Sequence, residues 1–465
     1  MVDPVWFCRR ANMLSIVTRA GKIRSDGSVW VIACFVCLCS WAVGTCRAAD
    51  SWPQFRGPSG QGDAGAANLP DDWTHSDYLL WKTKVPGRGW SSPVVMDGQV
   101  WLTTGIEMEA SAELRAQQLE GDRFAGSKEV SQSVMLHAVG IDLHSGTQLY
   151  NVHLVELGEP VPIHSLNSYA SPTPVLEAGR LYCHFGRFGV FCVEMASGQI
   201  VWRNQLKETH SVGPGSSPIL AGPLLILTCD GLEEQYMVGL DKATGEIVWR
   251  TNRPPLEGDD TETLKSFTTP LLIETANGQQ LFSPGAQWVA AYDPPSGKEL
   301  WRMRHGKGFS LVPRPVEDDG VVYFYSGFSG QGLFAIRTDG HDDVTDSHVV
   351  WNQPDVASTR PSAVIVDARI YTVTERGMVS CVQAVNGEVV WRKRLRGNFS
   401  ASLVVSGDRI HAFSEDGVVT IFRTGDEYEK IAEHDLAERI MASPAVIGDS
   451  ILVRTESHLL KIGSP

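Results

Sequence analysis

The chain has 465 residues, of which 43% are hydrophobic and 20% are charged, so a folded globular body is expected. The formal net charge of −14 argues against nucleic acid as a partner, because phosphate binding requires a basic surface.

Residues 1–48 predict a signal peptide. Basic residues between Arg9 and Arg24 precede the apolar run Val29–Gly44, and small residues follow near Ala48. A positive region, a short apolar region and a cleavage site of small residues are typical of export signals. We therefore expect export to the periplasm or cell envelope, without a transmembrane anchor after cleavage.

Alternatives remain open at this end of the chain. Met13 is a second candidate start, because the basic region before the apolar run is long. The run could also stay uncleaved as an anchor helix, although it is short for spanning a bilayer. A lipoprotein, with Cys46 as the lipidated residue, is a further alternative.

Eight copies of one unit fill most of the remaining chain. Each copy has a Ser/Thr-Pro-like start, an apolar run, a tight turn and a second apolar run. The copies begin at Ser91, Ser171, Ser216, Thr268, Val312, Arg360, Ser400 and Ala442. Their spacing is mostly 40 to 52 residues, with one gap of 80 after the first. A period of this length with several short strands per copy predicts an all-β, eight-bladed β-propeller of four-stranded antiparallel blades over residues 76–465.

The two ends of the repeat predict how the ring closes. The eighth copy stops at His458–Gly463, after its third strand, whereas Asp77–Val85 is a Trp-containing strand without a blade. We expect this N-terminal strand to complete the last blade, which leaves no unprotected edge. Residues 49–75 are then an N-terminal extension.

The phrase "KATGEIVWR" (Lys242–Arg250) recurs around the ring and predicts the hairpin between the third and fourth strands of a blade. An Asp or Ser before the Gly can hydrogen-bond the turn, and the Gly can take positive φ. The tryptophan is expected to dock neighbouring blades, and Tyr150 replaces it in the first blade. The predicted docking residues are Trp81, Trp202, Trp249, Trp301, Trp351 and Trp391.

This Asp-x-x-Ser/Thr-Gly-x-x-x-Trp repeat resembles the PQQ-like β-propeller superfamily, which includes quinoprotein alcohol dehydrogenases and the outer-membrane assembly lipoprotein BamB. The phrases "WPQFRGPSGQG" (Trp52–Gly62), "NSYASPTPV" (Asn167–Val175) and "GPGSSPIL" (Gly213–Leu220) resemble exported bacterial members of that family. The resemblance covers residues 51–465. It implies the propeller fold but no established activity.

Loop lengths indicate where a binding site should lie. Loops between the fourth and first strands, and between the second and third, share one face and carry the length and the chemistry, whereas the turns of the other face are short. The longest segment is an insertion in the first blade, residues 106–132, with a short helix expected over Ala110–Glu120. The predicted ligand-binding residues are His164, Asn167, Arg187, Asp230, Gln287, Trp288, Arg314 and Arg360.

Arg314 and Arg360 stand out among these residues. Both occupy positions at which other blades begin their first strand with Ser or Thr, so they should point into or near the central channel. Two arginines there could hold a carboxylate or a phosphate. Alternatively, they pair with Asp230, Glu375 or Glu415 and line a solvated funnel.

Cysteines and acidic residues give few chemical motifs. After residue 48 there is no CxxC motif and no adjacent cysteine pair, and no metal site is predicted. A two-residue turn at Arg187 and Phe188 would place Cys183 opposite Cys192, as a disulfide or as two free thiols.

Two classes of function follow. The first is a noncatalytic scaffold that binds an envelope protein or glycan through its long-loop face. The second is a quinoprotein dehydrogenase that holds PQQ and calcium; such enzymes use an adjacent-cysteine disulfide, a stacking tryptophan and a catalytic Asp that no motif here matches. A role in outer-membrane assembly like that of BamB rests on fold resemblance alone.

Overall fold

A computed structural model describes residues 50–73 and 76–464. The predicted signal peptide and Cys46 lie outside the described residues. In the described part of the chain, no helix is both long and apolar enough to cross a bilayer.

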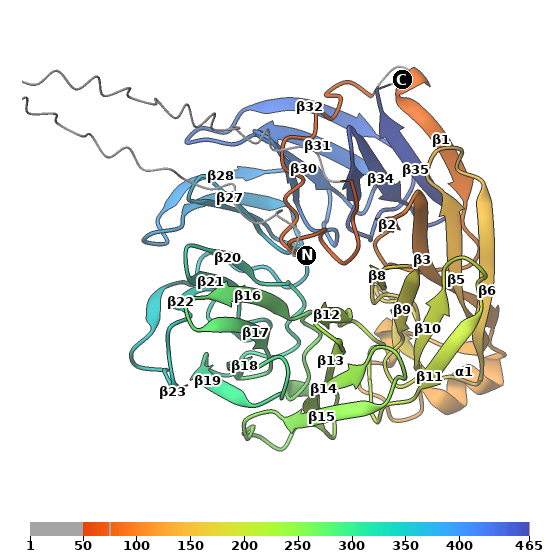
Figure 1. The fold of residues 1–465 in the computed structure, drawn as a ribbon, viewed down its shortest axis with the longest axis horizontal. Helices are drawn as coiled ribbons and strands as arrows, with labels where there is room; N and C mark the ends of the chain where they lie inside the picture. Colours follow the sequence, from red (N-terminus) through yellow and green to blue (C-terminus); the bar gives the residue numbers. More distant parts are fainter. Residues whose placement is uncertain (1–49, 74–75, 465) are drawn as a thin grey trace, which may run out of the picture. The chain divides into compact units, whose positions relative to one another are not determined.

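The described residues form a ring of eight four-stranded antiparallel blades, as predicted (Figure 1). Blade 1 consists of β2 (Val94–Met96), β3 (Gln99–Glu109), β5 (Ser131–Asp142) and β6 (Gln148–Gly158), and blade 2 of β8 (Val175–Glu177), β9 (Arg180–His184), β10 (Val190–Glu194) and β11 (Ile200–Asn204). Blade 3 consists of β12 (Ile219–Ala221), β13 (Leu224–Asp230), β14 (Gln235–Asp241) and β15 (Ile247–Asn252), and blade 4 of β16 (Leu271–Thr275), β17 (Gly278–Pro284), β18 (Trp288–Tyr292) and β19 (Glu299–Arg304).

Blades 5 to 8 follow the same plan. Blade 5 consists of β20 (Val316–Asp318), β21 (Val321–Tyr325), β22 (Leu333–Arg337) and β24 (Val349–Gln353), and blade 6 of β25 (Val364–Val366), β26 (Arg369–Val373), β27 (Met378–Gln383) and β28 (Val389–Arg394). Blade 7 consists of β29 (Val404–Ser406), β30 (Arg409–Phe413), β31 (Val418–Arg423) and β32 (Lys430–Asp435), and blade 8 of β33 (Ala445–Ile447), β34 (Ser450–Arg454), β35 (His458–Gly463) and β1 (Leu79–Lys84). The pairing of β1 with β35 confirms that the N-terminal strand closes the ring.

Burial explains the sequence of each blade. The two middle strands are covered on both faces by neighbouring blades, and all seven residues of β13 are buried. The outer strand β15 buries only Trp249 fully and exposes residues on both sides of it. Continuous apolar runs therefore mark middle strands, and an isolated tryptophan marks an outer strand.

The tryptophan of an outer strand hydrogen-bonds the next blade. In five blades the indole Nε1–H donates to a backbone carbonyl in the neighbouring turn between third and fourth strands, at 2.9–3.1 Å. The glycine of that turn lies directly against the ring: a Cβ on Gly297 would be 2.4 Å from Trp249. Tyr150 makes the corresponding contact, from its hydroxyl to the Ala196 carbonyl.

Trp301 departs from this pattern. Its indole donates to Gln280 Oε1 within its own blade. The next blade lacks the usual turn, because its chain leaves to form β23 (Asp342–Asp343), which pairs in parallel with β19. The fourth blade therefore has a fifth strand at its outer edge.

A belt of hydroxyl groups joins the blades around the channel. At six joins, the backbone N–H of the residue two positions before a first strand donates to the Ser or Thr hydroxyl at the same position of the next blade, at 2.8–3.0 Å. We call these residues the hydroxyl belt. Its members are Ser92, Thr173, Ser217, Thr269, Ser362, Ser402 and Ser443. The Ser/Thr-Pro signal of the sequence therefore has a structural role between blades.

Arginines bridge the two joins that lack a belt hydrogen bond among the described residues. Between the fourth and fifth blades Arg314 takes the belt position, and its Nε donates to the Pro270 carbonyl at 3.1 Å. Between the eighth and first blades Arg454 donates to the carbonyls of Ser91 and Thr103. Burial lowers the pKa of each guanidinium to about 9, which still leaves both charged at neutral pH.

The N-terminal extension closes one end of the channel. Trp52 pairs with Val95 of the first blade, and Asp63 pairs with Val405 of the seventh (Figure 1, red-orange). We call residues 52–68 the plug. Arg56 is fully buried within it and donates to backbone carbonyls, including those of Gln61 and Ala363 at 2.5 Å. The phrase "WPQFRGPSGQG" thus seals the channel on the side of the short turns.

The expected register of Cys183 and Cys192 is wrong, and of the two alternatives the structure has the two free thiols. The turn after β9 has three residues, Gly186–Phe188, since Phe185 N–H donates to the Gly189 carbonyl. Cys183 consequently pairs with Phe191, and Cys192 pairs with Tyr182. A shift of one residue places the two thiols on opposite faces of the sheet, and both are free and buried.

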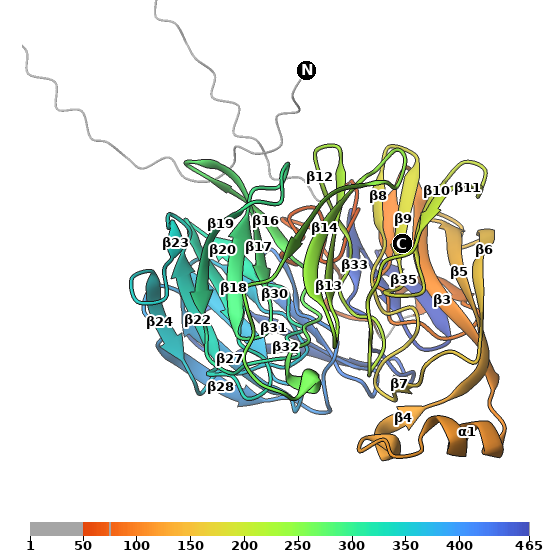
Figure 2. The same cartoon turned by 90° about the horizontal axis from the view of Figure 1, so that it is seen from below.

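The insertion in the first blade contains the expected helix, α1 (Ala112–Gln118), which is capped by Ser111 and buries Leu114. The flanking strands are longer than predicted, because β3 and β5 pair as far as Glu109 and Ser131. Beyond the helix, β4 (Lys128–Glu129) pairs with β7 (Ile163–His164) of the following loop. Figure 2 shows α1, β4 and β7 together on one face of the ring.

Candidate functional site

A cavity of about 540 Å³ occupies the channel above the plug. Six belt residues form its lower tier: Ser92, Thr173, Ser217, Thr269, Ser402 and Ser443. Phe55 of the plug also lines it. The cavity is therefore closed below by the plug and opens toward the long-loop face.

The residues two positions before the belt form the upper tier. Unlike the belt, these residues differ from blade to blade. They are Trp90, Ser171, Gly215, Phe267, Val312, Arg360, Ser400 and Met441. Trp90, Phe267, Val312 and Met441 give an apolar wall. A volume of this size and a mixture of apolar walls and few polar groups are typical of small-molecule sites.

Three of the eight predicted ligand-binding residues line this cavity: His164, Asn167 and Arg360. Arg360 lies in the upper tier, two positions before the belt residue Ser362, so its predicted register is wrong by two residues. Its Nη1 atom is 3.2 Å from Glu415 Oε1. The arginine therefore forms the ion pair that was the alternative to ligand binding.

His164 faces the cavity as a neutral imidazole. Its Nδ1 accepts a hydrogen bond from the Leu166 N–H at 3.1 Å, so Nε2 carries the proton in the neutral form. Burial lowers the pKa of His164, and the charges of Arg360 and Lys265 lower it further. The group can therefore donate a hydrogen bond at neutral pH without carrying a charge.

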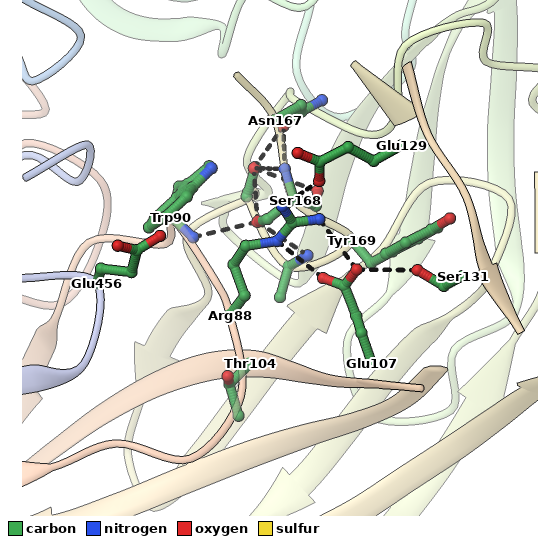
Figure 3. Close-up of polar contacts among 12 residues, drawn as sticks. Arg88, Trp90, Thr104, Glu107, Glu129, Ser131, Asn167, Ser168, Tyr169 and Glu456 are labelled. Atoms are coloured by element: carbon green, nitrogen blue, oxygen red, sulfur yellow. Dashed lines mark hydrogen bonds and ion pairs between the residues drawn. The ribbon is translucent and has the colours of Figure 1, made fainter. Parts of the chain in front are cut away.

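The Asn167 side chain uses its hydrogen-bonding groups to hold its own loop in place. Its amide nitrogen donates to the carbonyls of Val212 and Pro214, and its oxygen accepts from the N–H of Ser168 and the hydroxyl of Ser171. Figure 3 shows this cluster beside Trp90, whose backbone N–H donates to Ser168 Oγ. The amide fixes the cavity wall rather than presenting free hydrogen-bonding groups.

The other predicted residues lie outside the cavity lining. Asp230 is buried in a bidentate ion pair with Arg253, and burial raises the pKa of its carboxyl despite that charge. Gln287 binds both the N–H and the carbonyl of Glu257. These side chains are structural.

Trp288 and Arg314 are also held by the protein itself. The Trp288 indole donates to the Pro255 carbonyl, and two arginines lie over its ring. Arg314 points to the plug, where it donates to the Phe55 carbonyl and to Gln54 Oε1. Arg187 lies in the turn after β9, and its carbonyl accepts from Gln205 Nε2.

Sequence reasoning missed most of the lining, including Trp90, Phe267 and Lys265. The signal was present: the two tiers emerge when the eight copies are aligned on the belt hydroxyl instead of on the proline. Lys265 is buried and contacts Ser211 and Glu262. Burial lowers the pKa of Lys265, although the Glu262 carboxylate opposes this effect.

A polar network ties the insertion to the ring at the cavity edge. Arg88 donates to both carboxylate oxygens of Glu107, at 2.8 and 2.9 Å, and to Glu129 of β4. Figure 3 shows the guanidinium between these two carboxylates, with Ser131 bound to Glu107. The insertion is therefore a fixed platform on the long-loop face.

The residues present do not fit a quinone–calcium centre. Hard cations require several oxygen ligands, yet Glu375 is the single carboxylate among the residues that line the cavity. Across the described residues, no group of three His, Cys, Asp or Glu side chains could hold a metal ion. We derive no chemical step through such a cofactor.

The sequence matches a PQQ-like family model, described as outer membrane protein assembly factor BamB, over residues 136–276, 285–341 and 342–460. The chain belongs to this family. A curated relative, the outer membrane protein assembly factor BamB of Bordetella pertussis, is 25% identical over 391 residues, covering 79% of this chain and 84% of its own length.

Solved structures show the same fold at low identity. The BamB structure from Moraxella catarrhalis has a TM-score of 0.51 at 13% identity, covering 78% of this chain and 99% of that one. A europium-containing methanol dehydrogenase has a TM-score of 0.64 at 10% identity, covering 88% and 90%. Since one fold serves both, the fold alone does not decide between a binding protein and an enzyme.

Proposed function

We propose that this protein is an exported, noncatalytic scaffold of the cell envelope that binds a protein partner through its long-loop face. The observation that carries the proposal is the platform formed by the insertion, which exposes apolar side chains. Met108 is 60% exposed and Phe124 is 41% exposed. Leu166 and Phe328, on other loops of the same face, are also exposed. Exposed apolar groups on a fixed surface are typical of protein interaction sites.

The relatives favour one form of this function. They are named outer membrane protein assembly factors, and the match extends over most of the chain. We therefore propose that the partner belongs to the machinery that assembles outer-membrane proteins. The predicted signal peptide supports an envelope location.

The platform can be tested with matched surface variants. The double variant Met108→Ser, Phe124→Ser should lose the partner retained from envelope extracts by the wild-type protein. Val385→Ser is the control, because Val385 is 74% exposed in a turn of the opposite face. Retention of the partner by the double variant, or its loss in the control, would contradict the proposed surface.

The assembly role and the enzyme alternative need separate measurements. Cells that lack the protein should contain less folded outer-membrane protein, and unchanged amounts would argue against an assembly role. The alternative of a PQQ- and calcium-dependent dehydrogenase predicts a thermal shift when both are added to purified protein. A shift that requires both additives would favour the enzyme.

A further inference from the structure

Four buried polar atoms of residues that line the cavity have no hydrogen-bond partner among the described residues. They are Trp90 Nε1, Ser92 Oγ, Glu375 Oε2 and Arg360 Nη1, which contacts Glu415 as an ion pair but has no hydrogen-bond partner. Trp90 is only 8% exposed and Ser92 only 1%. A buried polar group without a partner destabilises the folded protein, so donors and acceptors gathered on one cavity indicate a bound polar molecule.

The floor of the cavity adds further hydrogen-bond donors. Each belt hydroxyl at Thr173, Ser217, Thr269, Ser402 and Ser443 accepts a hydrogen bond from one backbone N–H. Within the described part of the chain, the hydroxyl hydrogens of these five residues take part in no hydrogen bond. A hydroxyl group can donate as well as accept, so the floor presents a ring of available O–H donors.

The wall above this floor is apolar and partly aromatic. Trp90 and Phe267 stand in the upper tier with Val312 and Met441, and Phe55 reaches the cavity from the plug. Aromatic faces carry partial negative charge and attract the weakly positive C–H groups of a ligand. A ligand that fills the cavity must therefore combine an apolar face with a polar rim.

The charges favour a neutral ligand. Arg360 is already paired with Glu415, and Lys265 with Glu262. Glu375 adds a negative group, the exposed Arg376 adds a positive one, and His164 is neutral at physiological pH. The charges of the described residues that line the cavity and of their ion-pair partners therefore balance, and an ionic ligand would leave a net charge there.

We propose that the cavity binds a short neutral saccharide. A pyranose ring has an apolar C–H face that suits the aromatic wall, and hydroxyls on its edge that both donate and accept. Those hydroxyls would accept from the Trp90 indole and the belt, and would donate to Glu375. The site is distinct from the exposed platform, so this inference does not rest on the proposed protein partner.

Calorimetric titration of the purified protein tests the inference. The probes are maltose, cellobiose and N,N′-diacetylchitobiose, with inorganic phosphate as an anionic probe and Gly-Gly-Phe as a peptide probe. We expect at least one disaccharide to bind. Trp90→Phe keeps the aromatic wall and removes the N–H donor, and Glu375→Ala removes the acceptor. Each should weaken binding roughly tenfold, the effect of one lost hydrogen bond.

Two controls keep the test decisive. Trp288→Phe removes an indole outside the cavity and should leave the affinity unchanged. Ser92→Ala should also weaken binding. It is a small change, so it serves as the test variant if Trp90→Phe does not fold. Binding of phosphate or the peptide alone, binding unaffected by all cavity variants, or no disaccharide binding at millimolar concentration would overturn the inference. The Met108→Ser, Phe124→Ser variant should still bind the disaccharide, so the two proposals can fail separately.

Discussion

Two buried histidines should make the propeller sensitive to mild acid. His305 is 1% exposed, and His411 is fully buried in β30. Burial lowers the pKa of each imidazole to about 4, from an ordinary value of 6.5. His305 Nε2 donates to the Gly285 carbonyl, whereas neither ring nitrogen of His411 has a partner among the described residues. Both rings must stay neutral in the folded protein.

The sign and size of the effect follow from these pKa values. As the pH falls below 6.5, these two histidines bind protons in the unfolded chain, whereas in the folded protein they remain neutral down to about pH 4. Stability is therefore complete above pH 6.5 and declines between pH 6.5 and 4. One pKa unit corresponds to about 1.4 kcal/mol, so each histidine should lower the free energy of unfolding by about 2 kcal/mol at pH 5.

His411→Leu should remove about 2 kcal/mol of the loss in unfolding free energy between pH 7.5 and 5. Urea unfolding followed by tryptophan fluorescence at several pH values measures it. Leu fits this site because the imidazole makes no hydrogen bond, so stability at pH 7.5 should change by no more than about 1 kcal/mol. His341→Leu, at an exposed loop position, is the matched control. A pH dependence identical to that of the wild type would refute the reasoning.

Three further predictions concern the scaffold. Arg56→Met should cost about 3 kcal/mol in urea unfolding and expose the plug to proteases, because buried carbonyls such as that of Ala363 lose their donor; an unchanged digestion pattern would count against the plug. Gly297→Ala should cost about 2–4 kcal/mol, because its φ is +68° and its Cβ would strike Trp249, whereas Gly278→Ala at φ +104°, with open space, should cost about 1 kcal/mol. Cys183 and Cys192 should both be alkylated after denaturation without a reductant, and a mass two hydrogens lower than that of the free dithiol would contradict their assignment.

The repeat made the architecture predictable. Copies of one unit with a fixed period specify blades, and the missing strand of the eighth copy specified how the ring closes. The docking glycine and tryptophan were recognisable because both occur in one local hairpin. Local chemistry repeated along the chain is the strongest signal that a sequence offers.

Features that depend on tertiary contacts were not predictable. The belt hydroxyl precedes a proline in most blades, but in the sixth blade Pro361 comes before Ser362, and this inversion caused Arg360 to be assigned to the wrong tier. The register of Cys183 depended on whether a turn has two residues or three. No local pattern in the plug indicates that Arg56 will meet carbonyls more than 300 residues away.

The contrast between the two tiers of the cavity separates scaffold from site. A ring of identical blades would place the same residue at every position of a tier, and the belt nearly does so, because each hydroxyl holds the next blade. Two positions earlier the backbone has the same geometry, yet the side chains range from Gly215 to Trp90. Packing between blades does not require that variety. The upper tier is therefore the part of this repeated fold in which the surface is asymmetric. Selective binding of a small molecule requires such an asymmetric cavity, here above a sealed channel.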